Sequence, residues 1–177
     1  MTAHVALVRG INVGGRTKVA MADLRRLFEE AGCAPVTTYI QSGNVVFGHA
    51  RPAAVVAAIE RAMRGELGVT ARILWRSAGE MADLAARNPL PGRDETRLAV
   101  TFLEEPAGPE AVSSLEPERF APDEFVVEGR HVYLHCPNGY GRTKLSNAFL
   151  ERRLGSVATT RNWNTVLTLT RMSASPG

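Results

Sequence analysis

Apolar positions in the first half of the chain follow the period of a strand in some segments and that of a helix in others. Residues 4–8 form a short apolar run typical of a buried strand, whereas apolar residues from Met21 to Phe28 recur at helical spacing. Two β-rich runs flank Ser42-Gly43, which predicts a hairpin turn. The pattern predicts a strand at 4–8, a helix at 19–31, strands at 37–41 and 44–47, a helix at 52–67 and a strand at 69–75.

The second half repeats this order of elements after a break at residues 88–92, where two prolines and a glycine interrupt the pattern. Before the break, residues 77–87 predict a helix with Ser77 as its N-cap and Glu80 completing a capping box. After it, the pattern predicts a strand at 98–103, a helix at 109–115, strands at 125–127 and 131–135, a helix at 145–154, a strand at 157–160 and a helix at 163–172.

Both halves therefore predict the order strand, helix, strand, strand, helix, strand. Each half includes a hairpin, which joins antiparallel strands and which a purely parallel sheet would not contain. We expect an α+β fold made of two tandem ferredoxin-like βαββαβ units. The expected divisions are a first unit at 1–76, a helix and linker at 77–92, and a second unit with a C-terminal helix at 93–177.

Composition places the chain among soluble globular proteins. It has 177 residues, of which 45% are hydrophobic and 22% are charged, with a net charge of +3. This mildly basic balance permits an acidic or phosphorylated partner but is too weak to indicate nucleic-acid binding alone. No apolar run approaches the length of about 18 residues that a membrane helix needs, and Arg9 interrupts the run that could resemble a signal peptide. Cys33 and Cys136 lie in no disulfide pattern, so we expect a reducing, cytoplasmic location without membrane contact.

Lys18 and Lys144 are the only lysines among 21 basic residues, and each one ends the tetrapeptide Gly-Arg-Thr-Lys. An ammonium group is a compact charge with an adjustable pKa, whereas guanidinium is a planar group that stays charged, so the two are not interchangeable at a site. A chain that otherwise uses arginine is expected to keep lysine where the ammonium chemistry matters. The repeated tetrapeptide therefore indicates an anionic ligand, although it does not name that ligand.

Residues 10–17 match the phosphate-loop pattern Gly-x-x-x-x-Gly-Lys-Thr except that Arg16 replaces the lysine. The segment follows a predicted strand and precedes a predicted helix, as such a loop requires. However, the predicted hairpin does not belong in the parallel sheet of nucleotide hydrolases. No convincing acidic partner for magnesium follows an apolar strand, since Glu104 is only a weak candidate. The sequence therefore disfavours a nucleotide-hydrolysing loop and keeps the broader hypothesis of an anion bound by backbone amides.

Backbone N–H groups at a helix start lack partners and carry partial positive charge, so they favour anions. We expect both tetrapeptides to occupy such starts. We also expect the first and third strands of each unit to run parallel, which would place the two lysines at equivalent ends of their sheets. The Ser42-Gly43 turn would then lie at the end opposite Lys18. The alternative is that the glycines only turn the chain and that both lysines lie in water.

The expected ligand-binding residues combine charged side chains with glycines that allow close backbone approach. They are Arg9, Gly10, Asn12, Gly14, Gly15, Arg16, Thr17, Lys18, Gly139, Tyr140, Gly141, Arg142, Thr143, Lys144, Arg161 and Asn162. Asn162 also suits a turn or a helix N-cap, which is the alternative for this residue.

Four segments of the chain carry a family resemblance: LVRGINVGG at 7–15, YIQSGNV at 39–45, GYGRTKL at 139–145 and ATTRNWNT at 158–165. Taken together, they resemble the uncharacterised domain-of-unknown-function family 1697. The resemblance covers nearly the whole chain and implies an α+β fold in one compact body. It implies no activity, no cofactor and no catalytic residue.

His131 and His135 lie four residues apart on a predicted strand, so their rings would be about 13 Å apart, which is too far for one metal ion. We expect no metal site and no cofactor. The strand at 4–8 carries no aromatic residue that could stack a base, which disfavours RNA recognition on the sheet face. Binding of a phosphate backbone through the loops stays open.

Two functions follow as hypotheses. In the first, the Gly-Arg-Thr-Lys loops hold a phosphate-bearing or other anionic small molecule, in a binding protein or in an enzyme whose chemistry the sequence does not specify. In the second, the chain is an interaction module whose basic loops meet a nucleic-acid backbone or an acidic protein. A Schiff-base lysine is a less favoured third option, because the loops are polar and apolar burial is the main way to depress a lysine pKa.

Overall fold

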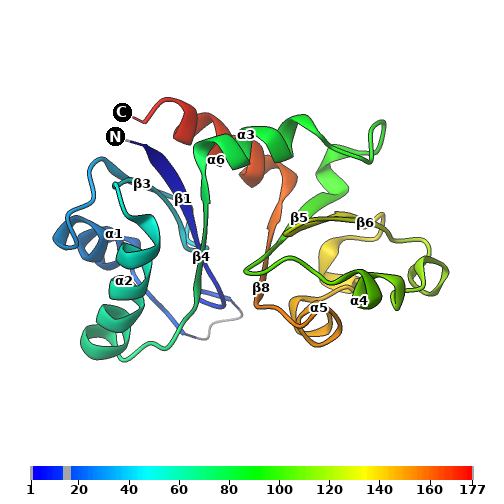
Figure 1. Ribbon diagram of the computed structural model, residues 1–177, viewed down its shortest axis with the longest axis horizontal. Helices are drawn as coiled ribbons and strands as arrows, with labels where there is room; N and C mark the ends of the chain where they lie inside the picture. Colours follow the sequence, from blue (N-terminus) through cyan, green and yellow to red (C-terminus); the bar gives the residue numbers. More distant parts are fainter. Residues whose placement is uncertain (1, 14–16, 177) are drawn as a thin grey trace. The chain divides into compact units, whose positions relative to one another are not determined.

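The structure is a computed structural model, and it describes residues 2–13 and 17–176. The chain forms two compact units, Met1–Asp83 with Thr168–Gly177 and Leu84–Leu167. Each unit contains one four-stranded antiparallel sheet with two helices on one face (Figure 1). The predicted α+β fold with two ferredoxin-like units is confirmed. Within the described residues, no helix is both long enough and apolar enough to cross a membrane.

The first unit follows the predicted order of elements. They are β1 (Ala3–Val8), α1 (Met21–Glu30), β2 (Val36–Tyr39), β3 (Asn44–Gly48), α2 (Pro52–Leu67) and β4 (Ile73–Ser77), with sheet order β2-β3-β1-β4. The strand β4 begins at Ile73 and not at Val69. Gly68 takes a left-handed φ of 66°, and the N–H of Val69 donates to the carbonyl of Met63 at 3.1 Å. Val69 therefore completes the C-terminal cap of α2 instead of starting the strand.

The core of the first unit lies between its sheet and the helices α1 and α2. Ala6 and Val8 of β1 belong to this core, and every residue of β1 is buried, which explains its uninterrupted apolar run. The fully buried rings of Phe28 in α1 and Phe47 in β3 pack with centroids 5.1 Å apart. Truncating a buried phenylalanine typically costs about 3–5 kcal/mol, so this pair is a principal anchor of α1 on the sheet.

The second unit repeats the arrangement. Its elements are the 3-10 helix η1 (Glu95–Arg97), β5 (Leu98–Leu103), α4 (Pro109–Ser113), the 3-10 helix η2 (Pro117–Phe120), β6 (Glu124–Glu128), β7 (His131–His135), the 3-10 helix η3 (Tyr140–Arg142), α5 (Asn147–Leu154) and β8 (Ala158–Asn162). The sheet order β6-β7-β5-β8 is the same permutation as in the first unit. Helices α4 and α5 lie on one face of this sheet (Figure 1). Leu150 and Leu154 of α5 belong to the same hydrophobic cluster as Leu134 of β7.

The first and third strands of each unit run antiparallel. In the first unit β1 pairs with β3, with Val5 opposite Val46, and in the second unit β5 pairs with β7, with Val100 opposite Tyr133. The expectation that these strands run parallel is therefore wrong. The first helix returns the chain so that the second strand runs parallel to the first, and the hairpin then reverses the third strand. Consequently the loops after β1 and after β7 leave their own sheets at non-equivalent ends.

A helix follows the last strand of each sheet directly, and a polar residue caps each start. Ser77 Oγ accepts the N–H of Glu80 at 3.1 Å while the Glu80 carboxylate accepts the N–H of Ser77 at 2.8 Å, so the predicted capping box of α3 (Ala78–Ala86) is confirmed. Asn162 Oδ1 accepts the N–H of Thr165 at 2.8 Å and caps α6 (Trp163–Ala174). Both capped junctions fix the direction in which the chain leaves the sheet.

Gly48 in β3 has no room for a side chain. A Cβ at this position would lie 2.3 Å from the carbonyl oxygen of Ala34. Two backbone hydrogen bonds of 3.0 Å, from Ala34 N–H to Gly48 O and from Gly48 N–H to Pro35 O, hold that carbonyl in place. We expect Gly48→Ala to lower the free energy of unfolding by about 2 kcal/mol or more, as measured by urea denaturation.

Gly65 in α2 supplies the matched control. A Cβ there would meet nothing within 4 Å, and alanine favours a helix over glycine by about 1 kcal/mol. Gly65→Ala should therefore raise the free energy of unfolding. Effects of the same sign and size at both glycines would contradict the close backbone approach at Gly48.

Candidate functional site

The side chain of Asn12 holds the loop after β1, which we call the first cationic loop (residues 9–19). Its Nδ2 donates to the carbonyl of Val19 at 2.9 Å, and its Oδ1 accepts the N–H of Val19 at 2.8 Å. The N–H of Asn12 also donates to the carbonyl of Thr17 at 3.0 Å. One amide side chain thus joins the two sides of the loop. Gly14, Gly15 and Arg16, three of the expected ligand-binding residues, lie outside the described residues.

The same amide joins this loop to the hairpin turn between β2 and β3. Asn12 Nδ2 donates to the carbonyl of Gln41 at 2.7 Å, and the N–H of Val8 donates to the carbonyl of Gly43 at 2.9 Å. Gly43 permits this approach, because a Cβ there would lie 2.9 Å from side-chain carbons of both Val8 and Ile11. The expected separation of the Ser42-Gly43 turn from this loop is wrong, because β1 and β2 both run antiparallel to β3.

Backbone strain gathers in the first cationic loop and the neighbouring turn. Among the described residues, the non-glycine residues with positive φ are Asn12 at 54°, Thr17 at 48° and Ile40 at 49°. The strain is greater for Thr17 and Ile40 than for Asn12, because a β-branched side chain crowds the left-handed backbone. Ile40 and Val13 also leave 50% and 64% of their surface exposed. Strain of this kind concentrates at functional sites, so this end of the sheet is a candidate site on grounds independent of charge.

Lys18 is exposed and lies two residues before Ala20, the N-cap of α1. Ala20 gives the first turn of the helix no side-chain cap. Among the described residues, no carboxylate forms an ion pair with Lys18 or with Lys144. Arg9 is half-buried, and its N–H donates to the carbonyl of Arg72 at 2.8 Å. The described part of the first tetrapeptide, Thr17 and Lys18, therefore precedes a helix start without a side-chain cap.

The second tetrapeptide lies in a different setting, which we call the second cationic loop (residues 136–146). Gly139 takes a φ of 92°, and the 3-10 helix η3 occupies Tyr140–Arg142. The start of α5 is already capped, because Ser146 Oγ accepts the N–H of Phe149 at 3.2 Å. Lys144 precedes this cap by two residues. The expectation that the second tetrapeptide occupies an open helix start is therefore wrong for this loop.

Arg142 and Lys144 instead line a pocket of about 230 Å³ in the second unit. A third cation, Arg119, comes from the separate segment around η2, as does the carboxylate of Asp123. The remaining lining residues are Phe120, Ala121, Pro122, Asn138 and Gly139. The side chain of Arg119 forms an ion pair with Glu116. Three cations thus share one small pocket with a single carboxylate.

The hydroxyl of Thr143 connects the two walls of this pocket. Its Oγ1 donates to Asp123 Oδ2 at 2.7 Å and accepts the N–H of Leu145 at 3.1 Å. This fixes the backbone on both sides of Lys144. Sequence analysis missed Arg119 and Asp123, because nothing in the pattern near η2 signals that this segment meets a loop about twenty residues later.

The lining of this pocket does not include Tyr140, Gly141, Arg161 or Asn162, which are further expected residues of the second unit. Tyr140 donates its hydroxyl to Thr160 Oγ1 at 3.1 Å, and burial raises the pKa of this tyrosine. Arg161 in β8 is buried and donates from Nη1 to Thr159 Oγ1 at 2.7 Å and to the carbonyl of Thr160 at 3.0 Å. Burial lowers the pKa of Arg161 to about 10. Asn162 acts as the cap of α6, which was the alternative for this residue.

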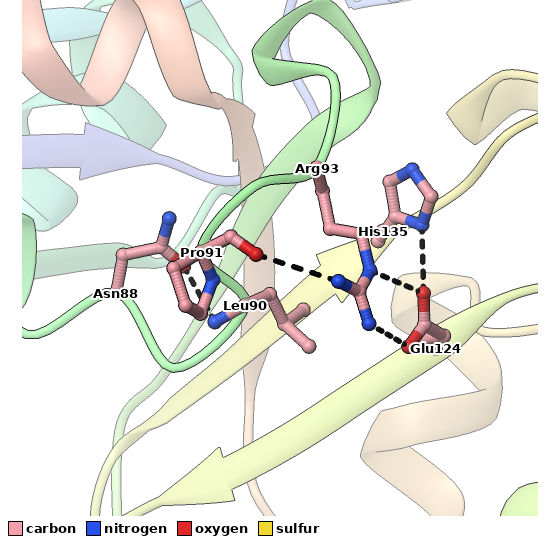
Figure 2. A network of polar contacts seen from close by, with 6 residues as sticks. All are labelled: Asn88, Leu90, Pro91, Arg93, Glu124 and His135. Carbon is pink, nitrogen blue, oxygen red and sulfur yellow. Dashed lines mark hydrogen bonds and ion pairs between the residues drawn. The ribbon is translucent and has the colours of Figure 1, made fainter.

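His135 belongs to a polar network that ties the segment after α3 to the sheet of the second unit (Figure 2). Arg93 forms a bidentate pair with Glu124 of β6, with distances of 2.8 Å and 2.9 Å, and His135 of β7 hydrogen-bonds Glu124 Oε1 at 3.1 Å. Arg93 also donates to the carbonyl of Pro91 at 3.4 Å. Among the described residues, no three histidine, cysteine or acidic side chains are grouped to hold a metal ion. The network has the geometry of a structural clamp.

Comparisons with known proteins agree with this fold. A family model described as a protein of unknown function (DUF1697) matches residues 1–133. This range includes the first two of the four segments that carry the predicted resemblance, and that prediction is confirmed. The solved structure of the conserved bacterial protein SP0830 from Streptococcus pneumoniae is similar, with a TM-score of 0.74 and 26% identity over 97% of this chain and 98% of that one. No curated protein matches the chain.

Replacement of Asn12 tests whether its side-chain hydrogen bonds hold the first cationic loop in place. Asn12→Ala removes the three side-chain hydrogen bonds and leaves alanine at a positive φ, so we expect a loss of about 2–4 kcal/mol in the free energy of unfolding. Asn138→Ala, which removes an exposed amide from the second unit, is the control and should change stability by less than about 0.5 kcal/mol. Urea denaturation measures both, and equal losses would contradict this role of the Asn12 side chain.

Acid titration tests the network of Figure 2. Hydrogen bonds from Arg93 are the largest cause that lowers the pKa of Glu124 to about 2. A carboxyl group with a depressed pKa contributes stability above its ordinary pKa, and this contribution disappears as the pH falls through the folded-state value. We therefore expect wild type to exceed Glu124→Gln in stability above about pH 5, and this advantage to shrink between about pH 5 and pH 2.

Denaturation at stepped pH measures this difference. The same comparison in an Arg93→Gln background should show much weaker pH dependence, because the principal partner of Glu124 is gone. A wild-type advantage that persists unchanged to pH 2 would show that Glu124 is not held by this network.

Proposed function

The chain belongs to the DUF1697 family of proteins of unknown function, and we propose that it binds a small anionic ligand, with a phosphate-bearing molecule as the best fit. The observation that supports this function is the pocket of the second unit. Arg142 and Lys144 come from the tetrapeptide, whereas Arg119 comes from a separate segment. Like charges repel, so three cations around one small pocket favour a ligand of opposite charge.

The three cations differ in what they offer such a ligand. Arg119 already pairs with Glu116, whereas Arg142 and Lys144 pair with no carboxylate of the described residues. A guanidinium group can donate two parallel hydrogen bonds to a phosphate, and an ammonium group acts as a point charge on a flexible stem. The amide of Asn138 adds a neutral donor. The pocket therefore offers both charge and directed donors.

We extend the proposal to the first cationic loop. Lys18 would supply charge there, shortly before the uncapped start of α1. Arg16, which the sequence also indicates as a source of charge, lies outside the described residues. The side-chain amide of Asn12 already forms hydrogen bonds with Val19 and Gln41. Its role would therefore be to hold the loop in place and not to contact the ligand. The strained backbone at Thr17 supports a functional role for this loop.

The second function is an interaction module for a nucleic-acid backbone or an acidic protein. The exposed cations of both loops suit such a partner, but the pocket volume of about 230 Å³ matches a small molecule better than a polymer. The two functions differ in their dependence on salt. Each phosphate contact of a nucleic acid releases counterions, so polymer binding would weaken steeply with added salt.

We propose a reducing compartment, the cytoplasm, as the place of action. Cys33 and Cys136 are both free and buried. Burial raises the pKa of the Cys33 thiol to about 11 and raises that of Cys136 as well. Both thiols are therefore protonated and unreactive near neutral pH, which agrees with structural cysteines in a reducing environment.

Calorimetric titration with inorganic phosphate and with simple phosphate esters tests the proposed function. We expect Lys144→Ala and Arg142→Ala each to weaken binding by about tenfold or more, because a hydrogen bond to a charged group contributes about 1.5–3 kcal/mol. Thermal unfolding of both variants should stay close to that of wild type, because both side chains are exposed.

Arg152→Ala is the matched control. Arg152 is exposed on α5, and its removal changes the net charge by the same amount without touching the pocket. Its affinity for phosphate should equal that of wild type. Equal binding by wild type, Lys144→Ala and Arg152→Ala would exclude the pocket as the anion site. Binding that collapses with moderate salt and appears only with polynucleotides would favour the interaction module.

A further inference from the structure

Asp123 is the one carboxylate among the side chains that line the pocket of the second unit. Its Oδ2 accepts the hydroxyl of Thr143 at 2.7 Å. Within the described part of the chain, no group donates to its Oδ1. A pocket with three cations thus also presents one carboxylate oxygen that can accept a further hydrogen bond.

This carboxylate works against a plain phosphate ion. A negative group on the pocket wall repels an anion, and the repulsion is considerable at the short distances within a small pocket. The arrangement therefore fits a ligand that offers two different groups. A phosphate would meet the cations, and a hydroxyl or other donor on the same molecule would meet Asp123.

The hydrogen bonds of Thr143 fix Asp123 in the role of an acceptor. The Thr143 hydroxyl accepts the N–H of Leu145 at 3.1 Å and directs its own proton to Asp123 Oδ2. The carboxylate is thereby held in the pocket that Lys144 also lines. Because these bonds join the segment after η2 to the second cationic loop, they fix the Asp123 carboxylate relative to the backbone on both sides of Lys144.

The size and the apolar wall of the pocket limit the rest of the ligand. A volume of about 230 Å³ lies below the range of about 300–1,000 Å³ that is typical for drug-sized ligands. Phe120 on the wall is held by edge contacts with Phe125 and Phe149, with ring centroids 5.7 Å and 5.5 Å away. Together with Pro122 it offers a firm apolar surface to a short carbon frame.

We infer that this pocket selects a small phosphate monoester that carries a hydroxyl group on its carbon frame, with Arg142 and Lys144 binding the phosphate and Asp123 accepting the hydroxyl. The inference rests on the proposed anion site and adds the class of its ligand. Asp123 is then a specificity-determining residue. It lowers the affinity for inorganic phosphate and raises the preference for the hydroxylated ester.

Four probes test this selectivity by calorimetry: glycerol 1-phosphate, propyl phosphate, inorganic phosphate and glycerol. The two esters share a three-carbon frame and differ in the hydroxyl groups. We expect the wild-type protein to bind glycerol 1-phosphate about tenfold more tightly than propyl phosphate, because a charged acceptor left without its donor costs binding free energy. Glycerol alone should not bind measurably, because it lacks the charge.

Asp123→Asn removes the negative charge and keeps an acceptor for the Thr143 hydroxyl. We expect the preference for glycerol 1-phosphate over propyl phosphate to fall to about threefold or less, because a neutral hydrogen bond is about half as strong as a charge-assisted one. The affinity for inorganic phosphate should rise by a few-fold, because the repulsion is gone. Glu110→Gln, an exposed carboxylate on α4 away from the pocket, is the control and should leave both quantities unchanged.

The outcomes separate this inference from the proposed function. If both esters bind equally to wild type, or if Asp123→Asn keeps the full preference, the assigned ligand class is overturned while Lys144-dependent phosphate binding can still stand. If no phosphate probe binds in a Lys144-dependent manner, the anion site itself is overturned. The comparison of the two esters uses the wild-type protein alone, so poor folding of Asp123→Asn would not prevent the test.

Discussion

Antiparallel pairing of the first strand with the third sets the positions of the functional loops in both units. Because β1 and β2 are both antiparallel to β3, the loop after β1 and the β2–β3 turn meet at one end of the first sheet. In the second unit β7 runs antiparallel to β5, the first strand of its sheet. The loop after β7 therefore leaves its sheet at the end opposite to the one at which a loop after the first strand would leave. The first cationic loop therefore contacts the β2–β3 hairpin turn, whereas the second cationic loop lines a pocket together with the segment around η2.

The register between the first and last strands of each sheet places equivalent residues at the same positions in the two units. Arg76 of β4 stands opposite Val5 of β1, and Arg161 of β8 stands opposite Val100 of β5. Both arginines are buried, and a helix-capping residue follows each of them directly. The buried arginine, the cap and the following helix therefore occur at matching places in the two units. Together with the repeated order of elements, this correspondence supports a structural duplication.

Periodicity and capping signals predicted the elements well, because these depend on residues close together in sequence. The helix at 52–67 and the Ser77–Glu80 capping box are examples. Strand direction was predicted wrongly, because no local pattern encodes it and only the connections through the helix and the hairpin determine it. The sequence marks only part of the pocket. The repeated tetrapeptide draws attention to Arg142 and Lys144, but Arg119 and Asp123 join them only through tertiary packing around η2. The helix start at Leu145 was wrong because Ser146 captures the first-turn amide.

The hydrogen bonds of the Asn12 side chain limit how the length of the first cationic loop can vary among homologues. The two hydrogen bonds between its side chain and Val19 depend on the number of residues that connect β1 and α1. Inserting or deleting one residue in that stretch would shift the partners out of reach. We therefore expect homologues with an asparagine at this position to conserve the number of residues between it and the start of α1. Changes in length are expected in loops that no such hydrogen bonds span.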